Sequence, residues 1–127
     1  MTRETILLVE DSLQVQAIAR RFLETAGYEV ITASDGEEGL RIYKQLHSSI
    51  GLLLTDVKMP RVNGLDLANR VQQLDSQLPI LLMSGDILSS DLSFSTIAKP
   101  FTRSALVDFV CNALDASEKR QERELVR

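Results

Sequence analysis

The segment LLLTD, Leu52–Asp56, places three consecutive leucines and a threonine directly before an acidic residue. A strand with one face in water alternates apolar and polar residues, whereas this run stays apolar on both faces. Two other runs share the pattern, ILLV at Ile6–Val9 and ILLM at Ile80–Met83. Strands that are buried on both faces are typical of a parallel sheet covered by helices on each side.

Two weaker runs, Tyr28–Ala33 and Thr96–Ala98, complete five candidate strands, and longer segments of helical period separate most of them. Apolar residues that recur every three or four positions predict amphipathic helices. Residues of these stripes are Val15, Ile18, Ala19, Phe22 and Leu23, then Leu40 and Tyr43, then Leu65, Ala68, Val71 and Leu74, and last Leu106, Phe109, Val110, Ala113 and Leu114. Asp35 and Thr102 are candidate N-caps, and Gly27 is a candidate helix stop. The alternation predicts an α/β, flavodoxin-like, doubly wound fold with a five-stranded parallel sheet in the order 2-1-3-4-5.

The connection between the fourth and fifth candidate strands is shorter than the others. Only residues Gly85–Ser95 are available there, and the segment is rich in serine and aspartate. Two connecting loops of about 2–6 residues each leave room for little more than a turn or two of helix. We therefore expect the fourth helix to be short or missing.

Length, charge and cysteine content exclude several classes of protein. A chain of 127 residues has the length of a single domain. Its net charge of −4 gives it no general electrostatic attraction for nucleic acid. The single cysteine, Cys111, is expected to be a small core residue and fits a reducing, cytoplasmic environment. The first apolar run, Ile6–Val9, is too short for a signal peptide or a membrane span.

Chemically active side chains follow the predicted strands at their carboxyl ends. Glu10 and Asp11 follow the first strand, Asp56 the third, Ser84 the fourth and Lys99 the fifth. In an open parallel sheet, ligands bind at this edge, where the strand order reverses. Neighbouring strands lie about 4.8 Å apart, so three carboxylates would be crowded and would need a cation or a proton. Oxygen ligands of this kind suit Mg²⁺.

Four motifs in this order resemble the receiver domain of response regulators in two-component signalling. The motifs are ILLVEDS (Ile6–Ser12), LLLTDVKMPRVNGLDL (Leu52–Leu67), ILLMSGD (Ile80–Asp86) and IAKPF (Ile97–Phe101). The resemblance covers Glu4 to Leu114, nearly the whole chain. It implies a phosphoacceptor module that takes a phosphoryl group from a histidine kinase or a histidine phosphotransfer protein. It also implies that the chain is not an enzyme beyond Mg²⁺-dependent self-phosphorylation and slow autodephosphorylation.

The resemblance assigns a role to each acidic residue at the strand ends. Asp56 matches the phospho-accepting aspartate. Asp11 matches a direct ligand of Mg²⁺, and Glu10 matches its acidic neighbour, which acts through water. The backbone carbonyl of Lys58 matches the third protein ligand of the metal. The metal set implied by the resemblance is thus Glu10, Asp11, Asp56 and Lys58.

The resemblance also assigns two groups that contact the phosphoryl group on Asp56. Ser84 matches a hydroxyl that hydrogen-bonds this group, and Lys99 matches a lysine that pairs with it. Pro100 matches a proline preceded by a cis peptide bond. One departure stands out, because Thr96 occupies a position where the family places an aromatic switch residue. This departure implies that the signal does not leave through the usual surface of helix four, strand five and helix five.

Two alternative functions share some of these features with a receiver domain. A small phosphohydrolase of the haloacid dehalogenase kind also uses an aspartate nucleophile with a lysine and Mg²⁺. Its motif needs a second aspartate two residues after the nucleophile, where this chain has Lys58. A flavin-binding flavodoxin-like domain would need Ser, Thr or Gly after the first strand for the flavin phosphate, where this chain has Glu10 and Asp11.

The domain boundaries are predicted from the end of the apolar pattern. Residues 1–116 are expected to form the receiver domain, and residues 117–127 a charged C-terminal tail or helix extension, since they carry acidic and basic residues in mixture. A stand-alone regulator and a domain of a hybrid histidine kinase or longer regulator both fit the sequence. Met1 lies close to the first strand, which favours a true N-terminus. The output is expected to be binding to a further protein.

Overall fold

The computed structural model describes residues 5–59, 61–85 and 94–125, with side chains up to residue 120. The elements in chain order are β1 Thr5–Val9, α1 Leu13–Thr25, β2 Glu29–Ala33, α2 Gly36–Leu46, β3 Ile50–Asp56, α3 Gly64–Leu74, β4 Ile80–Ser84, β5 Ser95–Ala98 and α4 Arg103–Leu125. The helix that we expected to be short or missing falls on residues 86–93, outside the described residues. The label α4 therefore belongs to the helix that follows β5.

The five strands form one parallel sheet in the order β2-β1-β3-β4-β5, which confirms the predicted flavodoxin-like topology. The register pairs Val9 of β1 with Thr55 of β3, and Asp56 of β3 with Met83 of β4. Because all strands run in the same direction, their carboxyl ends meet at one edge. The side chains that follow β1, β3, β4 and β5 are thereby gathered in one place.

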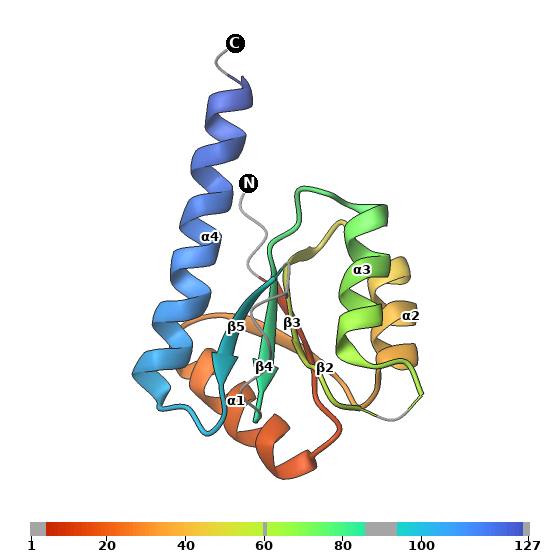
Figure 1. Ribbon diagram of the computed structural model, residues 1–127. Coiled ribbons are helices and arrows are strands. Elements are labelled where there is room, and N and C mark those ends of the chain that lie inside the picture. The colour runs from red at the N-terminus through yellow and green to blue at the C-terminus, as the bar shows by residue number, and fades with distance from the viewer. Residues whose placement is uncertain (1–4, 60, 86–93, 126–127) are drawn as a thin grey trace.

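Helices cover both faces of the sheet (Figure 1), with α2 and α3 on one face and α1 and α4 on the other. Successive residues of a strand point to opposite faces of the sheet and pack against different helices. In β3, Leu53 packs toward α2 and α3, whereas Leu52 and Leu54 pack toward α1 and α4. All three leucines are fully buried. Burying a leucine stabilises a fold by about 1.5–3 kcal/mol, so the two layers together favour apolar side chains at these three successive positions. For this reason apolar and polar residues do not alternate in the sequence of this run.

Both predicted N-caps are confirmed. The Asp35 carboxylate accepts a hydrogen bond from the Glu38 amide at 2.8 Å, and the Thr102 hydroxyl accepts one from the Ala105 amide at 3.1 Å. These bonds satisfy amides that have no partner within the helix. Gly27 follows α1 with a φ of 101°, a left-handed conformation that glycine adopts without a steric penalty.

Three apolar residues are more exposed than the stripes predicted. Ile18 is 50% exposed and Leu74 is 57% exposed, and Cys111 is exposed as well. Ile18 and Cys111 each adjoin a buried residue, Ala19 and Val110, and one position along a helix rotates a side chain by about 100°. Leu74 is the last residue of α3. The expectation that Cys111 is a core residue was wrong.

The last helix is long, and it projects past the sheet (Figure 1). It runs from Arg103 to Leu125, so the charged segment that begins at Ser117 continues the helix. Ser117 itself is buried. The division of the chain at residue 116 stays a prediction. Among the described helices, none is both long enough and apolar enough to cross a lipid bilayer.

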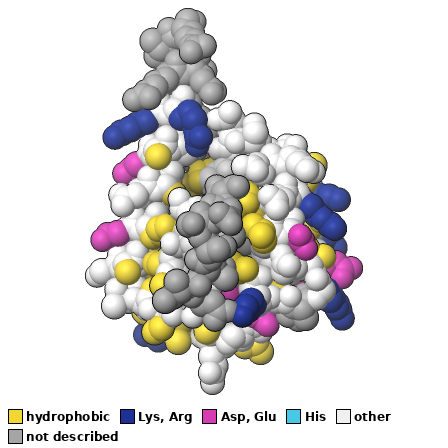
Figure 2. Space-filling view, in the orientation of Figure 1, with side chains coloured by type: hydrophobic (Ala, Val, Ile, Leu, Met, Phe, Trp, Pro, Cys, Tyr) yellow, Lys and Arg dark blue, Asp and Glu magenta, His cyan; other side chains and the backbone are white. Residues whose placement is uncertain are grey.

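The surface that faces the viewer in the orientation of Figure 1 carries charges of both signs. Figure 2 shows acidic and basic side chains scattered toward the rim of this face, with hydrophobic side chains nearer its centre. At the carboxyl edge of the sheet, by contrast, several acidic side chains lie close together.

Candidate functional site

Three carboxylates converge where β1 and β3 end. Each of Glu10, Asp11 and Asp56 offers an oxygen that lies within 4.8 Å of the others. Glu10 is fully buried and Asp56 is 5% exposed, whereas Asp11 is exposed. The predicted adjacency of β1 and β3 brings the three residues together. Hard oxygen ligands at this spacing, with one of them open to solvent, fit Mg²⁺, which binds few carboxylates and keeps several waters.

A lysine from the far strand joins the acids. Lys99 follows β5, and its Nζ donates to Glu10 Oε1 at 3.0 Å and to Asp56 Oδ1 at 3.1 Å. The Lys99 backbone amide also donates to the carbonyl oxygen of Ser84 at 2.7 Å, which ties this residue to the end of β4. The Lys99–Pro100 peptide bond is cis, as the resemblance implied. The long side chain thus reaches Asp56 past the end of β4, and Glu10 past the ends of β4 and β3.

Burial and crowding alter the protonation of this cluster. The pKa of Glu10 is raised from 4.5 to about 7, first because burial disfavours its charged form and then because it shares a hydrogen bond with Asp56. Hydrogen bonds from Lys99 and from the Ser12 amide oppose this rise. Burial lowers the pKa of Lys99, but its hydrogen bonds with Glu10 and Asp56 outweigh that effect, so the pKa lies above its ordinary value. One lysine therefore does not balance the acids, and a divalent cation would complete the neutralisation.

Two further predicted residues lie at the same edge. Ser84 ends β4 and is buried, one residue beyond Met83, the partner of Asp56 in the sheet. Lys58 lies two residues after Asp56 in the loop between β3 and α3, and its side chain is exposed. The ligand that the resemblance implies is the backbone carbonyl of Lys58, so its side chain is not required to point toward the acids.

Sequence reasoning assigned no role at this site to two glycines that hold the loop after β3. A Cβ added to Gly64 would collide with the carbonyl oxygen of Asp56, and one added to Gly36 would collide with that of Val62. Gly64 begins α3, and its amide donates to the Val57 carbonyl at 2.8 Å. The closeness of Gly64 to the Asp56 backbone could not be predicted from the sequence, because it depends on how the loop after β3 folds back.

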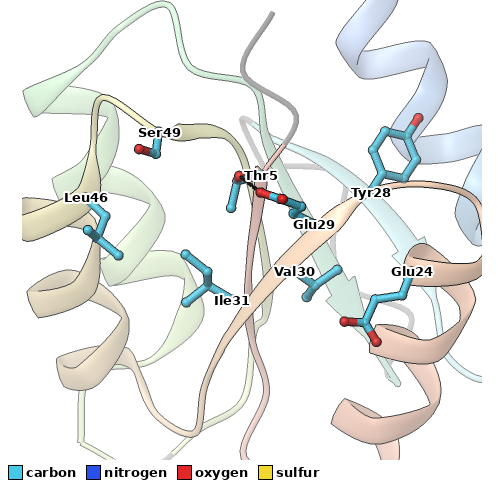
Figure 3. Close-up of a pocket in the computed structure, with 8 residues that line it drawn as sticks. All are labelled: Thr5, Glu24, Tyr28, Glu29, Val30, Ile31, Leu46 and Ser49. Carbon is cyan, nitrogen blue, oxygen red and sulfur yellow. Dashed lines mark hydrogen bonds between the residues drawn. The ribbon is translucent and has the colours of Figure 1, made fainter.

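A pocket of about 600 Å³ lies at the opposite edge of the sheet. Figure 3 shows its lining residues around the beginning of β2: Thr5, Glu24, Tyr28, Glu29, Val30, Ile31, Leu46 and Ser49. Thr5 begins β1 and Glu29 begins β2, so this is the amino edge, away from the three acids. In a parallel sheet the ligand site lies at the carboxyl edge, which favours the acidic cluster as the functional site.

Comparison with known proteins identifies the family. The chain matches the response regulator receiver domain over residues 6–110. It belongs to this family. Receiver domains are the phosphoacceptor modules of two-component signalling, and they receive phosphate from histidine kinases. They generally bind Mg²⁺ at an acidic pocket. The membership decides against the phosphohydrolase and flavodoxin alternatives.

The similar proteins include a sensor kinase and a transcriptional regulator. This receiver domain is 31% identical to the autoinducer 1 sensor kinase/phosphatase LuxN of Vibrio campbellii, over 87% of this chain and 14% of LuxN. It is 39% identical to the transcriptional regulatory protein CpxR of Escherichia coli, over 62% of this chain and 32% of CpxR. The chain thus spans well under half the length of these relatives.

Solved structures agree with the fold and with the family. The receiver domain of the hybrid histidine kinase CckA superposes with a TM-score of 0.77 at 34% identity, covering 87% of this chain and 98% of that one. NtrX from Brucella abortus gives a TM-score of 0.89 at 24% identity and covers 100% of this chain and 30% of that one, which supports the fold.

Proposed function

We propose that Asp56 of this receiver domain accepts a phosphoryl group from a phosphohistidine, carried by a histidine kinase or a histidine phosphotransfer protein, in a Mg²⁺-dependent reaction. The observation that carries the proposal is the contact of the buried Asp56 carboxylate with Lys99 Nζ at 3.1 Å, beside Glu10 and Asp11. A nucleophile, a fixed cation and a set of metal ligands are what phosphoryl transfer requires, because the reaction depends on positioning and charge neutralisation.

The transfer forms a bond between Asp56 Oδ and phosphorus as the bond from phosphorus to the donor imidazole nitrogen breaks. Lys99 Nζ lies against Asp56 and can pair with an oxygen of the incoming group, which lowers the repulsion between two anions. Glu10, Asp11, Asp56 and the Lys58 carbonyl would hold Mg²⁺. When bound, the metal neutralises phosphoryl oxygens and orients them.

The acyl phosphate changes the charge at the edge of the sheet. The group adds about −1.5 to −2 charges and three acceptor oxygens, and the Ser84 hydroxyl would donate to one of them. Movement of Ser84 at the end of β4 would alter the surface that a protein partner contacts. Water in the same site then hydrolyses the acyl phosphate slowly, which limits the lifetime of the signal.

The remaining parts of the proposal concern location and partners. The chain acts in the cytoplasm, which the lone unpaired cysteine and the expected kinase partner support. Its output is binding to a protein, and the domain itself makes no direct contact with nucleic acid, as its net charge of −4 favours.

The test is phosphorylation with acetyl phosphate and Mg²⁺, followed by intact-protein mass spectrometry. Wild type should gain one phosphoryl group, Asp56→Asn should gain none, and EDTA should suppress labelling of wild type. Asp66→Asn is a matched control, because Asp66 is an exposed aspartate on α3. Undiminished labelling of Asp56→Asn, or labelling in EDTA at the wild-type rate, would contradict the proposal.

A further inference from the structure

A side-chain amide ties the end of β1 to the end of β2. Gln16 lies in the second turn of α1, and its Nε2 donates to the carbonyl oxygen of Glu10 at 3.1 Å and to that of Ala33 at 3.1 Å. The Glu10 amide donates to the same Ala33 carbonyl at 3.0 Å. One glutamine side chain thus bonds to the backbone of both strands at the point where their pairing ends.

The position of this bond explains why a side chain is needed there. The pairing of β1 with β2 ends at Val9 and Ala33, and Ser12, three residues after Val9, caps α1. The Glu10 carbonyl therefore lies beyond the regular ladder, in a residue that is fully buried. A buried carbonyl requires a hydrogen-bond partner, and Gln16 provides it from the helix that follows.

We propose that Gln16 is a positioning residue for the metal-binding acids. The inference deepens the proposed Mg²⁺ site and rests on it. The carbonyl that Gln16 holds belongs to the peptide between Glu10 and Asp11, so its orientation sets the directions of both side chains. Asp11 is exposed, and surrounding side chains do not enclose it. Its carboxylate depends on its backbone for alignment, and groups that orient metal ligands commonly change affinity by about 10–100-fold.

The first experiment asks whether the contact exists in solution without metal. Gln16→Met keeps the length of the side chain and removes its donors. In EDTA, the amide nitrogen shifts of Asp11 and Ser34 should move, because each amide follows a carbonyl that loses a hydrogen bond. Gln14→Met is the matched control, since Gln14 is an exposed glutamine on the same helix, and it should leave both shifts in place.

The second experiment titrates MgCl₂ into the full chain by calorimetry. Gln16→Met should weaken Mg²⁺ binding by about tenfold, and Gln14→Met should match wild type. Acetyl phosphate labelling of Gln16→Met should be slow at low Mg²⁺ and recover when Mg²⁺ saturates, because the nucleophile and Lys99 are intact. A loss of folding alone would not give this recovery.

Gln16→Glu separates the role of the donor from the role of charge. At pH 8 it adds a negative charge near the cation site, so electrostatic attraction alone predicts tighter Mg²⁺ binding than in wild type. Loss of the donor predicts weaker binding, which is the expected result. Gln14→Glu controls for the charge. Wild-type Mg²⁺ affinity in Gln16→Met, or tighter binding in Gln16→Glu, would overturn the inference. Failure of wild type to label at Asp56 would instead overturn the proposed function, while the Mg²⁺ titrations would still test Gln16.

Discussion

The two edges of the sheet use similar groups to different effect. At the amino edge, the Thr5 hydroxyl donates to Glu29 Oε2 at 3.2 Å, and Glu29 is exposed (Figure 3). At the carboxyl edge, Lys99 donates to Glu10 at 3.0 Å, and Glu10 is fully buried. Each edge pairs a carboxylate with a donor, but at the carboxyl edge two further acids crowd the pair.

Topology accounts for the difference. The chain leaves β1 toward β2 and leaves β3 toward β4, so the two connections diverge at the carboxyl edge. Ligands bind at such a divergence in open parallel sheets, and here Glu10, Asp56 and Lys99 come together from the ends of three strands. Because the ion pair at this edge is buried, the free energy of unfolding is expected to depend strongly on pH and on Mg²⁺. The following predictions contrast the two edges.

The largest effect is expected from Lys99→Ala. The variant should bind Mg²⁺ normally, because Lys99 is not a metal ligand, but its rate of labelling by acetyl phosphate should fall by about 100-fold or more. Stopped samples analysed by mass spectrometry give this rate. Glu29→Gln at the amino edge should label at the wild-type rate. Equal rates in Lys99→Ala and Glu29→Gln would remove the functional distinction between the edges.

Magnesium should stabilise the fold through the carboxyl edge alone. At about 100 times its Kd, a ligand that binds only the native state raises the free energy of unfolding by about 2.7 kcal/mol. The melting temperature of wild type should therefore rise with Mg²⁺, and that of Asp11→Ala should respond far less. Glu29→Ala should respond as wild type does. The metal assignment fails if Asp11→Ala gains as much stability as wild type.

Gly64→Ala should distort the backbone that carries the nucleophile. The added Cβ collides with the Asp56 carbonyl, and overpacking of this kind costs about 1–3 kcal/mol of unfolding free energy. Urea denaturation measures the loss. Gly85→Ala is the control at the same edge, since a Cβ there meets none of the described residues within 4 Å. Similar stabilities for the two variants would show that the close approach at Gly64 is relieved by a small backbone movement.

The last prediction concerns the effect of pH on stability in metal-free buffer. The pKa of Glu10 in the folded protein is about 7, above its ordinary value of 4.5, so the folded state holds this proton more tightly than the unfolded state. Stability should therefore fall as pH rises from about 4.5 to 7, by about 1.4 kcal/mol for each pKa unit of difference that persists in solution. Glu10→Gln should lose this decline when urea midpoints are compared across the range. A decline of the same size in the variant would assign it to other groups.

Much of the fold followed from periodicity in the sequence. Runs such as Leu52–Thr55 predicted buried parallel strands because both of their faces must be apolar, and the resulting topology brought Asp56 next to the end of β1. The family motifs then named Ser84 and Lys99 at the ends of the next two strands. The roles of these residues stay predictions until the experiments above are done.

By itself, the sequence determined which groups stand at each strand end, since local pattern and chain order decide that. Only the tertiary structure decided how those groups interact. Lys99 contacts Glu10 from 89 residues further along the chain. The two carbonyls held by Gln16 and the approach of Gly64 to Asp56 depend on how a helix packs against the ends of the strands. The exposure of Cys111 is decided in the same way, because it depends on how α4 is rotated against the sheet. Such contacts are set by packing between elements, and a one-dimensional pattern carries no record of that packing.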